Sequence, residues 1–110
     1  MSKRVPVDAI KELQEYISSK IKDRGFDDET IHERLLLLVE EVGELVNATR
    51  KLRGMNVDEK RDIPNQVGEE LADVLNVLFA VVDELNIDLA NEFQKKEEKI
   101  DQRTYKRSKE

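Results

Sequence analysis

The sequence contains no cysteine, so it can form no disulfide, no thiolate metal site and no cysteine nucleophile. Tryptophan is also absent, and His32 is the only histidine, which argues against a Ser–His triad. No glycine-rich phosphate loop is found. No apolar run is long enough to span a membrane, and the N-terminus lacks the apolar core of a signal peptide. We therefore expect a cytoplasmic protein that does not bind a membrane.

Charge is abundant but unevenly distributed along the 110 residues. Charged residues make up 40% of the chain, and the formal net charge is −6. Residues 1–93 carry 12 Lys and Arg against 21 Asp and Glu, whereas residues 94–110 carry 7 against 4. An acidic body argues against nucleic acid as a partner, because phosphate backbones require a basic face. The basic end is compatible with a smaller anion or with a solvated helix end.

Apolar residues recur at steps of three and four, which is typical of helices, and no strand is expected. The predicted helices cover residues 8–24, 28–52, 64–85 and 88 to about 103. The predicted caps are Asp8, Asp27 or Asp28, and Asp88, with Gly25 and Gly54 after the first two helices. In the second helix the apolar stripe comprises Ile31, Leu35, Leu38, Val42, Leu45 and Leu52. Residues 53–63 are the longest predicted loop, and Pro64 fits a first helical turn.

The third helix is apolar nearly all round, since only Asn76 is polar between Val74 and Val82. A buried strand is the alternative, but the pattern continues from residue 67 to 85, which is too long for one strand. A helix that is apolar on all sides must be covered on all sides. The sequence therefore predicts one all-α, four-helix bundle-like domain over residues 1–110, completed by oligomerisation. Its core covers about residues 8–100, and residues 101–110 form a charged tail.

Two carboxylate pairs interrupt the apolar runs of the second and third helices: Glu41 with Glu44, and Glu70 with Asp73. Residues three apart lie one turn apart on nearly the same face, so four carboxylates converge if these helices pack side by side. Buried carboxylates need partners, and Mg²⁺ or Mn²⁺ binds oxygen ligands. Such pairs also occur on solvated helix faces, but two pairs inside apolar runs favour a site with two or more metal ions.

Neighbouring residues leave alternatives open. Glu40 either reaches a second ion or faces solvent, and Glu69 is expected to face solvent. His32 forms a Glu-x-x-His pair with Glu29, but di-iron bundles need two such motifs. We therefore expect His32 on the surface of its helix.

The stretches LLLLVEEVGELVNATR and VGEELADVLNVLFA resemble the MazG-like all-α nucleoside triphosphate pyrophosphohydrolases. The family pattern Glu-x-x-Glu, spacer, Glu-x-x-Asp corresponds here to Glu41–Glu44, 25 intervening residues and Glu70–Asp73. The resemblance covers residues 30–85 well and the outer helices loosely. It implies Mg²⁺-dependent hydrolysis of a (deoxy)nucleoside triphosphate between the α- and β-phosphates, in a homodimer or homotetramer that cleanses the nucleotide pool.

The resemblance also implies roles for particular residues. Glu41, Glu44, Glu70 and Asp73 would be metal ligands, and Glu41 or Glu40 would act as general base. Asn76 would lie near the sugar or base, although a core asparagine bonded to backbone is an equal alternative. Lys96, Lys99 and Arg103 would contact phosphates, but this end departs from the family's Lys-x-x-Asn-x-x-Arg-like run, so a solvated tail is an equal reading.

Two other functions compete. Phosphoribosyl-ATP pyrophosphohydrolases share the helical architecture and the acidic pairs, although the sequence around the acids is closer to the MazG-like branch. A non-catalytic helical interaction protein is the other alternative, but all four ligand positions are intact. Base preference cannot be read from carboxylates that hold only metal and phosphate.

Overall fold

The computed structural model describes residues 3–52 and 63–103. Within these ranges the chain forms four helices and no strands, which confirms the predicted all-α class. The helices are α1 (Val7–Asp23), α2 (Ile31–Leu52), α3 (Ile63–Glu84) and α4 (Leu89–Gln102). The part of the predicted long loop at residues 53–62, with Gly54, and the tail from residue 104 onward lie outside the described residues.

The ends of α1 differ in part from the prediction. The helix begins after Pro6, no side chain caps it, and Asp8 lies inside the first turn, so the predicted Asp8 cap is wrong. At the other end Gly25 adopts a φ of +77°, a left-handed conformation that glycine enters at no steric cost. The amide of Phe26 then donates to the carbonyl oxygen of Ile21 at 2.9 Å, which turns the chain back toward α1.

A capping box starts α2 where an aspartate cap was predicted. The amide of Glu33 donates to Oγ1 of Thr30 at 3.2 Å, and the amide of Thr30 donates to Oε1 of Glu33 at 2.8 Å. The helix therefore begins at Ile31 rather than at residue 28, because the Thr-x-x-Glu pair satisfies two free amides at once. The predicted cap at Asp27 or Asp28 is wrong.

The predictions for α3 and α4 are confirmed. Residues 74–82 belong to one continuous helix, which excludes the strand alternative. The chain leaves α3 through Asn86, whose φ of 52° is left-handed. Asp88 then caps α4, since its Oδ1 accepts a hydrogen bond from the amide of Asn91 at 3.2 Å.

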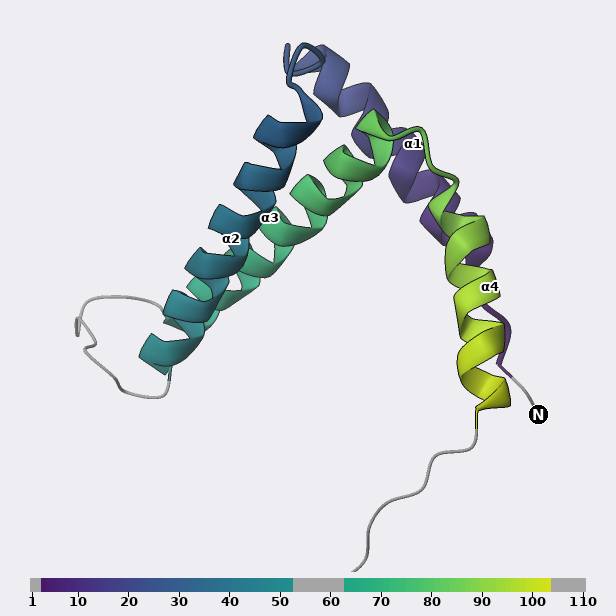
Figure 1. Ribbon diagram of the computed structural model, residues 1–110. Helices are drawn as coiled ribbons and strands as arrows, with labels where there is room; N and C mark the ends of the chain where they lie inside the picture. The colour runs from purple at the N-terminus through teal and green to yellow at the C-terminus, as the bar shows by residue number, and fades with distance from the viewer. Residues whose placement is uncertain (1–2, 53–62, 104–110) are drawn as a thin grey trace, which may run out of the picture.

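The helices form an open arch rather than a closed bundle (Figure 1). Helices α2 and α3 run side by side as a hairpin, α1 packs against α3 near its C-terminal end, and α4 packs along α1. The radius of gyration is 17.7 Å, whereas a compact domain of about 100 residues has a value near 13 Å. One chain therefore leaves much of the α2–α3 hairpin uncovered.

The buried core lies where α1 crosses α3. Ile17, Ile21 and Phe79 form its centre, and the apolar residues packed around them are Ile10, Leu13, Ala80 and Leu89. The side chain of Gln14 donates to the carbonyl oxygen of Ile87 at 2.8 Å and accepts from the amide of Leu89 at 3.3 Å. This side chain holds the turn between α3 and α4 against α1.

The predicted apolar stripe of α2 is only partly covered, since Ile31, Leu38 and Leu45 are half-buried and its other members are exposed. The fully buried residues of α2 are Arg34 and Ala48, while Leu35 and Val42 of the predicted stripe are exposed. Leu36 and Val39 are each 71% exposed. The exposed apolar residues of α2 are Leu35, Leu36, Val39, Val42, Val46 and Leu52, and those of α3 are Leu71, Leu75 and Leu78. We call these the uncovered apolar rows.

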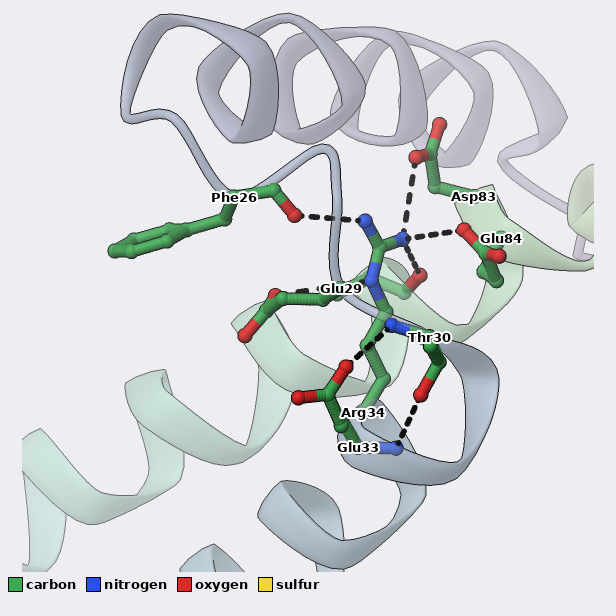
Figure 2. Close-up of polar contacts among 8 residues, drawn as sticks. Phe26, Glu29, Thr30, Glu33, Arg34, Asp83 and Glu84 are labelled. Carbon is green, nitrogen blue, oxygen red and sulfur yellow. Dashed lines mark hydrogen bonds and ion pairs between the residues drawn. The ribbon is translucent and has the colours of Figure 1, made fainter.

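Arg34 joins three parts of the fold and is only 1% exposed (Figure 2). Its Nη1 donates to the carbonyl oxygen of Ala80 in α3 at 2.7 Å, and its Nη2 donates to the carbonyl oxygen of Phe26 before α2 at 3.2 Å. Three carboxylates surround the guanidinium, namely Glu29 at 3.7 Å, Asp83 at 3.3 Å and Glu84 at 3.6 Å. The buried charge is thus compensated from both the turn before α2 and the end of α3.

Replacing Arg34 with Met should lower the free energy of unfolding by about 3 kcal/mol, because it removes the donor from two part-buried carbonyl oxygens and the cation from three neighbouring carboxylates. Urea unfolding at fixed protein concentration measures the change. Arg50→Met is the matched control, since Arg50 lies on the same helix and bonds only to nearby Asn47 among the described contacts. The control should change stability by less than about 0.5 kcal/mol; equal losses in both variants would contradict the role of Arg34.

Candidate active site and metal centre

Three carboxylates meet in the gap between α2 and α3. Glu41 and Glu44 lie one turn apart on α2, and Glu70 lies opposite them on α3. One oxygen from each side chain lies within 4.8 Å of the oxygens of the other two. Glu41 and Glu70 are half-buried, whereas Glu44 is exposed. We call these residues the carboxylate cluster.

The cluster fits a hard divalent cation. Among the residues that the structure describes, the buried Oε2 atoms of Glu41 and Glu70 have no hydrogen-bond partner. A buried, unpaired carboxylate oxygen is unfavourable, and a cation that takes oxygen ligands removes that cost. An all-oxygen donor set with no histidine or cysteine suits Mg²⁺ or Mn²⁺ better than zinc.

The electrostatics of the cluster agree with this assignment. Burial raises the pKa of Glu41 from 4.5 to about 7, and the charges of Glu44, Asp73 and Glu70 add to the effect. Burial also raises the pKa of Glu70, and the nearby charges of Glu44 and Asp73 add to the effect. Without a cation, the Glu41 carboxyl group therefore keeps its proton up to about pH 7, where a glutamate in water is ionised.

The fourth predicted ligand lies beside the cluster rather than within it. Asp73 is exposed, and its charge acts on both Glu41 and Glu70. It is not among the three residues whose oxygens lie within 4.8 Å of one another. Glu40 and Glu69 are exposed and lie outside the cluster. The structure thus brings three of the four predicted ligands together and places Asp73 at their edge.

Two cavities flank the cluster. The larger has a volume of about 470 Å³ and is lined by residues of α1, α2 and α3, including Glu41, Asp73 and Asn76. Asn76 is exposed, which excludes a buried core asparagine in this chain, and its contact with a substrate stays a prediction. The smaller cavity, about 210 Å³, is lined by Glu44, Glu70 and polar neighbours that include Lys51.

Sequence reasoning did not single out Phe26, Arg34 or Lys51, all of which line these cavities. A signal for Lys51 was present, since it follows Glu44 by seven residues and so shares its helix face. The other two residues could not be found in this way. Phe26 lies in the turn between α1 and α2, and Arg34 occupies a buried position that is usually apolar.

The predicted phosphate contacts on α4 lie elsewhere in this chain. Lys96, Lys99 and Arg103 are exposed, and α4 packs along α1, away from the α2–α3 gap (Figure 1). Their contact with a substrate stays a prediction, because within one chain they do not lie at the carboxylate cluster. His32 is exposed as expected, and its predicted partner Glu29 pairs with Arg34 instead.

The sequence profile of the MazG nucleotide pyrophosphohydrolase domain matches residues 29–108, a range that contains the whole cluster. The chain belongs to the MazG nucleotide pyrophosphohydrolase family. Members of this family typically depend on a divalent metal, for which the carboxylate cluster of this MazG domain is the candidate site. Comparisons with curated proteins and with solved structures give no significant match. Within the described residues, no helix is both long and apolar enough to cross a bilayer.

The metal-free protein should lose stability as the pH rises from about 4.5 to 7. The unfolded chain releases the Glu41 proton near pH 4.5, whereas the folded chain keeps it until about pH 7. The stabilisation from this group is therefore fully present below pH 4.5 and is lost as the pH passes through 7. Thermal unfolding with a chelator, from pH 4.5 to 8, measures this slope.

Glu41→Gln removes the titrating group, so the slope should flatten, whereas Glu40→Gln, on the exposed neighbour, should keep it. Added Mg²⁺ should raise the melting temperature most above pH 7, because the metal binds the ionised form. A wild-type slope equal to that of Glu41→Gln would contradict the assignment.

Proposed function

We propose that this MazG domain is a Mg²⁺-dependent nucleoside triphosphate pyrophosphohydrolase. It would cleave a ribo- or deoxynucleoside triphosphate between the α- and β-phosphates to give the monophosphate and pyrophosphate. The observation that supports this most is the pair of buried, unpartnered carboxylate oxygens in the α2–α3 gap of a chain from this family. Glu41, Glu44 and Glu70 would hold the metal, with Asp73 joining from the edge of the cluster.

The number of carboxylates favours more than one ion. Four ionised carboxylates exceed the charge that one divalent ion neutralises, so two or more Mg²⁺ or Mn²⁺ ions per site are proposed, with phosphate oxygens completing the ligand sets. When bound, Mg²⁺ supplies charge neutralisation for the phosphates and lowers the pKa of water.

The chain itself would supply the general base. Water attacks the α-phosphorus, the bond to the oxygen that bridges the α- and β-phosphates breaks, and pyrophosphate leaves with the bridging oxygen. The proton of the attacking water passes to Glu41 or Glu40, adjacent residues on α2. Because a triphosphate becomes a monophosphate that polymerases cannot use, we also propose a role in cleansing the cytoplasmic nucleotide pool.

Glu41→Gln and Asp73→Asn should each lower the rate of pyrophosphate release by at least about 100-fold, since each removes a ligand charge at nearly constant shape. Glu69→Gln, on the exposed neighbour of Glu70, should keep the wild-type rate. The assay measures pyrophosphate from a panel of nucleoside triphosphates with and without Mg²⁺, and circular dichroism verifies the fold.

Full activity in both ligand variants would exclude this site. Orthophosphate plus a diphosphate as products would show cleavage between the β- and γ-phosphates and would contradict the proposed reaction. A wild-type protein that acts only on phosphoribosyl-ATP would instead be a pyrophosphohydrolase of that substrate. Absence of any turnover would favour a non-catalytic interaction protein.

We also propose that the chain assembles as a homodimer or homotetramer through the uncovered apolar rows. Apart from Leu52, these residues recur at steps of three or four along the two helices that also carry the carboxylate cluster. An apolar surface of this extent is unusual on a monomer. A second copy would bury it and would also cover the sides of α3 that one chain leaves open.

The double variant Leu36→Glu/Val39→Glu should sediment as a monomer, because it places two charges where apolar contact is required. Tyr16→Glu is the control, since Tyr16 is similarly exposed but lies on α1. Analytical ultracentrifugation compares the masses. A wild-type monomer, or an unchanged mass in the double variant, would refute this interface.

A further inference from the structure

The two cavities beside the carboxylate cluster differ in chemical character. The larger shares Glu41 and Asp73 with the metal centre but has mainly apolar walls, including Ile17, Leu37 and Val77. The smaller shares Glu44 and Glu70 with the metal centre, and polar side chains complete it. The cluster thus separates an apolar side from a polar side.

Phe26 provides an aromatic surface on the apolar side. The residue lines the larger cavity and is 51% exposed. Its backbone is held at both ends, because its amide donates to Ile21 and its carbonyl oxygen accepts from Arg34. Figure 2 shows the ring pointing away from the guanidinium, so the Arg34 contact fixes the backbone and leaves the ring face free. A half-exposed ring on a fixed backbone is suited to stack on a flat ligand.

The residue that holds the Phe26 backbone lies on α2 two turns before the start of the carboxylate cluster, a separation on the scale of a nucleoside. Arg34 and Glu41 lie seven residues apart on α2, which corresponds to two turns or roughly 10 Å along one face. Phe26 is bound to the first of these residues, and the cluster begins at the second. Asn76 lines the same cavity between them and can hydrogen-bond a sugar or a base edge.

Lys51 provides a cation on the polar side. It lines the smaller cavity with Asn47 and Gln66, and it is half-buried. A cation with amide donors beside a metal centre is suited to phosphate oxygens. No cation of α4 is near this cavity, since α4 packs along α1.

From these observations we infer the direction in which a nucleotide lies across the cluster: the base stacks on Phe26 in the apolar cavity, and the pyrophosphate half lies beside Lys51. Phe26 and Lys51 are thereby substrate-binding residues. This inference rests on the proposed function. The opposite direction would bring the phosphates to Arg24, which lies at the rim of the larger cavity, so the experiments must distinguish the two.

A tryptophan reporter tests the base side directly, because the chain contains no natural tryptophan. The probes are α,β-imido analogues of the nucleoside triphosphates with Mg²⁺, which bind without being cleaved, and inorganic triphosphate, which has no base. In Phe26→Trp, the analogues should quench the fluorescence at saturation, and inorganic triphosphate should not. Tyr16→Trp is the control, since Tyr16 is 55% exposed and does not line the cavity. Its fluorescence should respond to neither probe.

Steady-state kinetics provide a second test of the same side. Phe26→Ala should raise KM for nucleoside triphosphates by about tenfold or more, the factor that the loss of one stacked base predicts, with kcat changed less than threefold. Phe26→Trp should retain the wild-type KM, which separates loss of stacking from misfolding. An unchanged KM in Phe26→Ala, or no quenching by any analogue, would overturn the inference.

Lys51→Gln tests the polar side. Product inhibition by pyrophosphate should weaken by about tenfold, whereas inhibition by the monophosphate should stay within twofold. Arg24→Gln is the control, and the reverse pattern in these two variants would establish the opposite direction. If the wild-type protein cleaves no nucleotide, inhibition cannot be measured, but quenching of Phe26→Trp still reports base binding, so failure of the proposed function and of the inferred direction are distinguishable.

Discussion

The close approach of Glu41, Glu44 and Glu70 across the α2–α3 gap is the constraint on which the rest of this structure depends. Three carboxylates with oxygens within 4.8 Å of one another repel unless protons or cations neutralise them. The pKa values of Glu41 and Glu70 are raised, so these carboxyl groups bind protons more tightly, and the protons contribute to this neutralisation. A site that is costly without cations and favourable with them couples metal binding to the stability of the helix pair.

Two turns away on the same helix, Arg34 presents the opposite case, a buried positive charge that needs negative partners. A fully buried guanidinium requires carboxylates and carbonyl oxygens around it, and the end of α3 and the turn after α1 provide them. These contacts join α1 to the hairpin at one end only. The space left between this junction and the carboxylate cluster is the larger cavity, so the position of the cavity follows from two charged centres on one helix face.

The open arch has a consequence for how the molecule functions as a whole. The face of α2 that packs on α3 carries the charged centres beside half-buried Leu38 and Leu45, and several other apolar residues of α2 point outward. A helix that uses its inner face for ligands must obtain its hydrophobic stabilisation from its other faces. The proposed assembly with further copies of the chain would meet this need without filling the site.

Helical periodicity and the spacing of the acids determined much of this protein from sequence alone: four helices, the cap at Asp88, and the shared helix faces of Glu41 with Glu44 and of Glu70 with Asp73. These features depend on residues within one or two turns of each other, whose relative positions a helix sets. Tertiary structure alone decided which face of α2 is inside, that Arg34 is buried, that Asp73 lies at the edge, and that Phe26 lines the cavity while α4 stays apart. Those outcomes depend on how α1 crosses α3, and contacts between residues far apart in sequence leave no periodic trace in the chain.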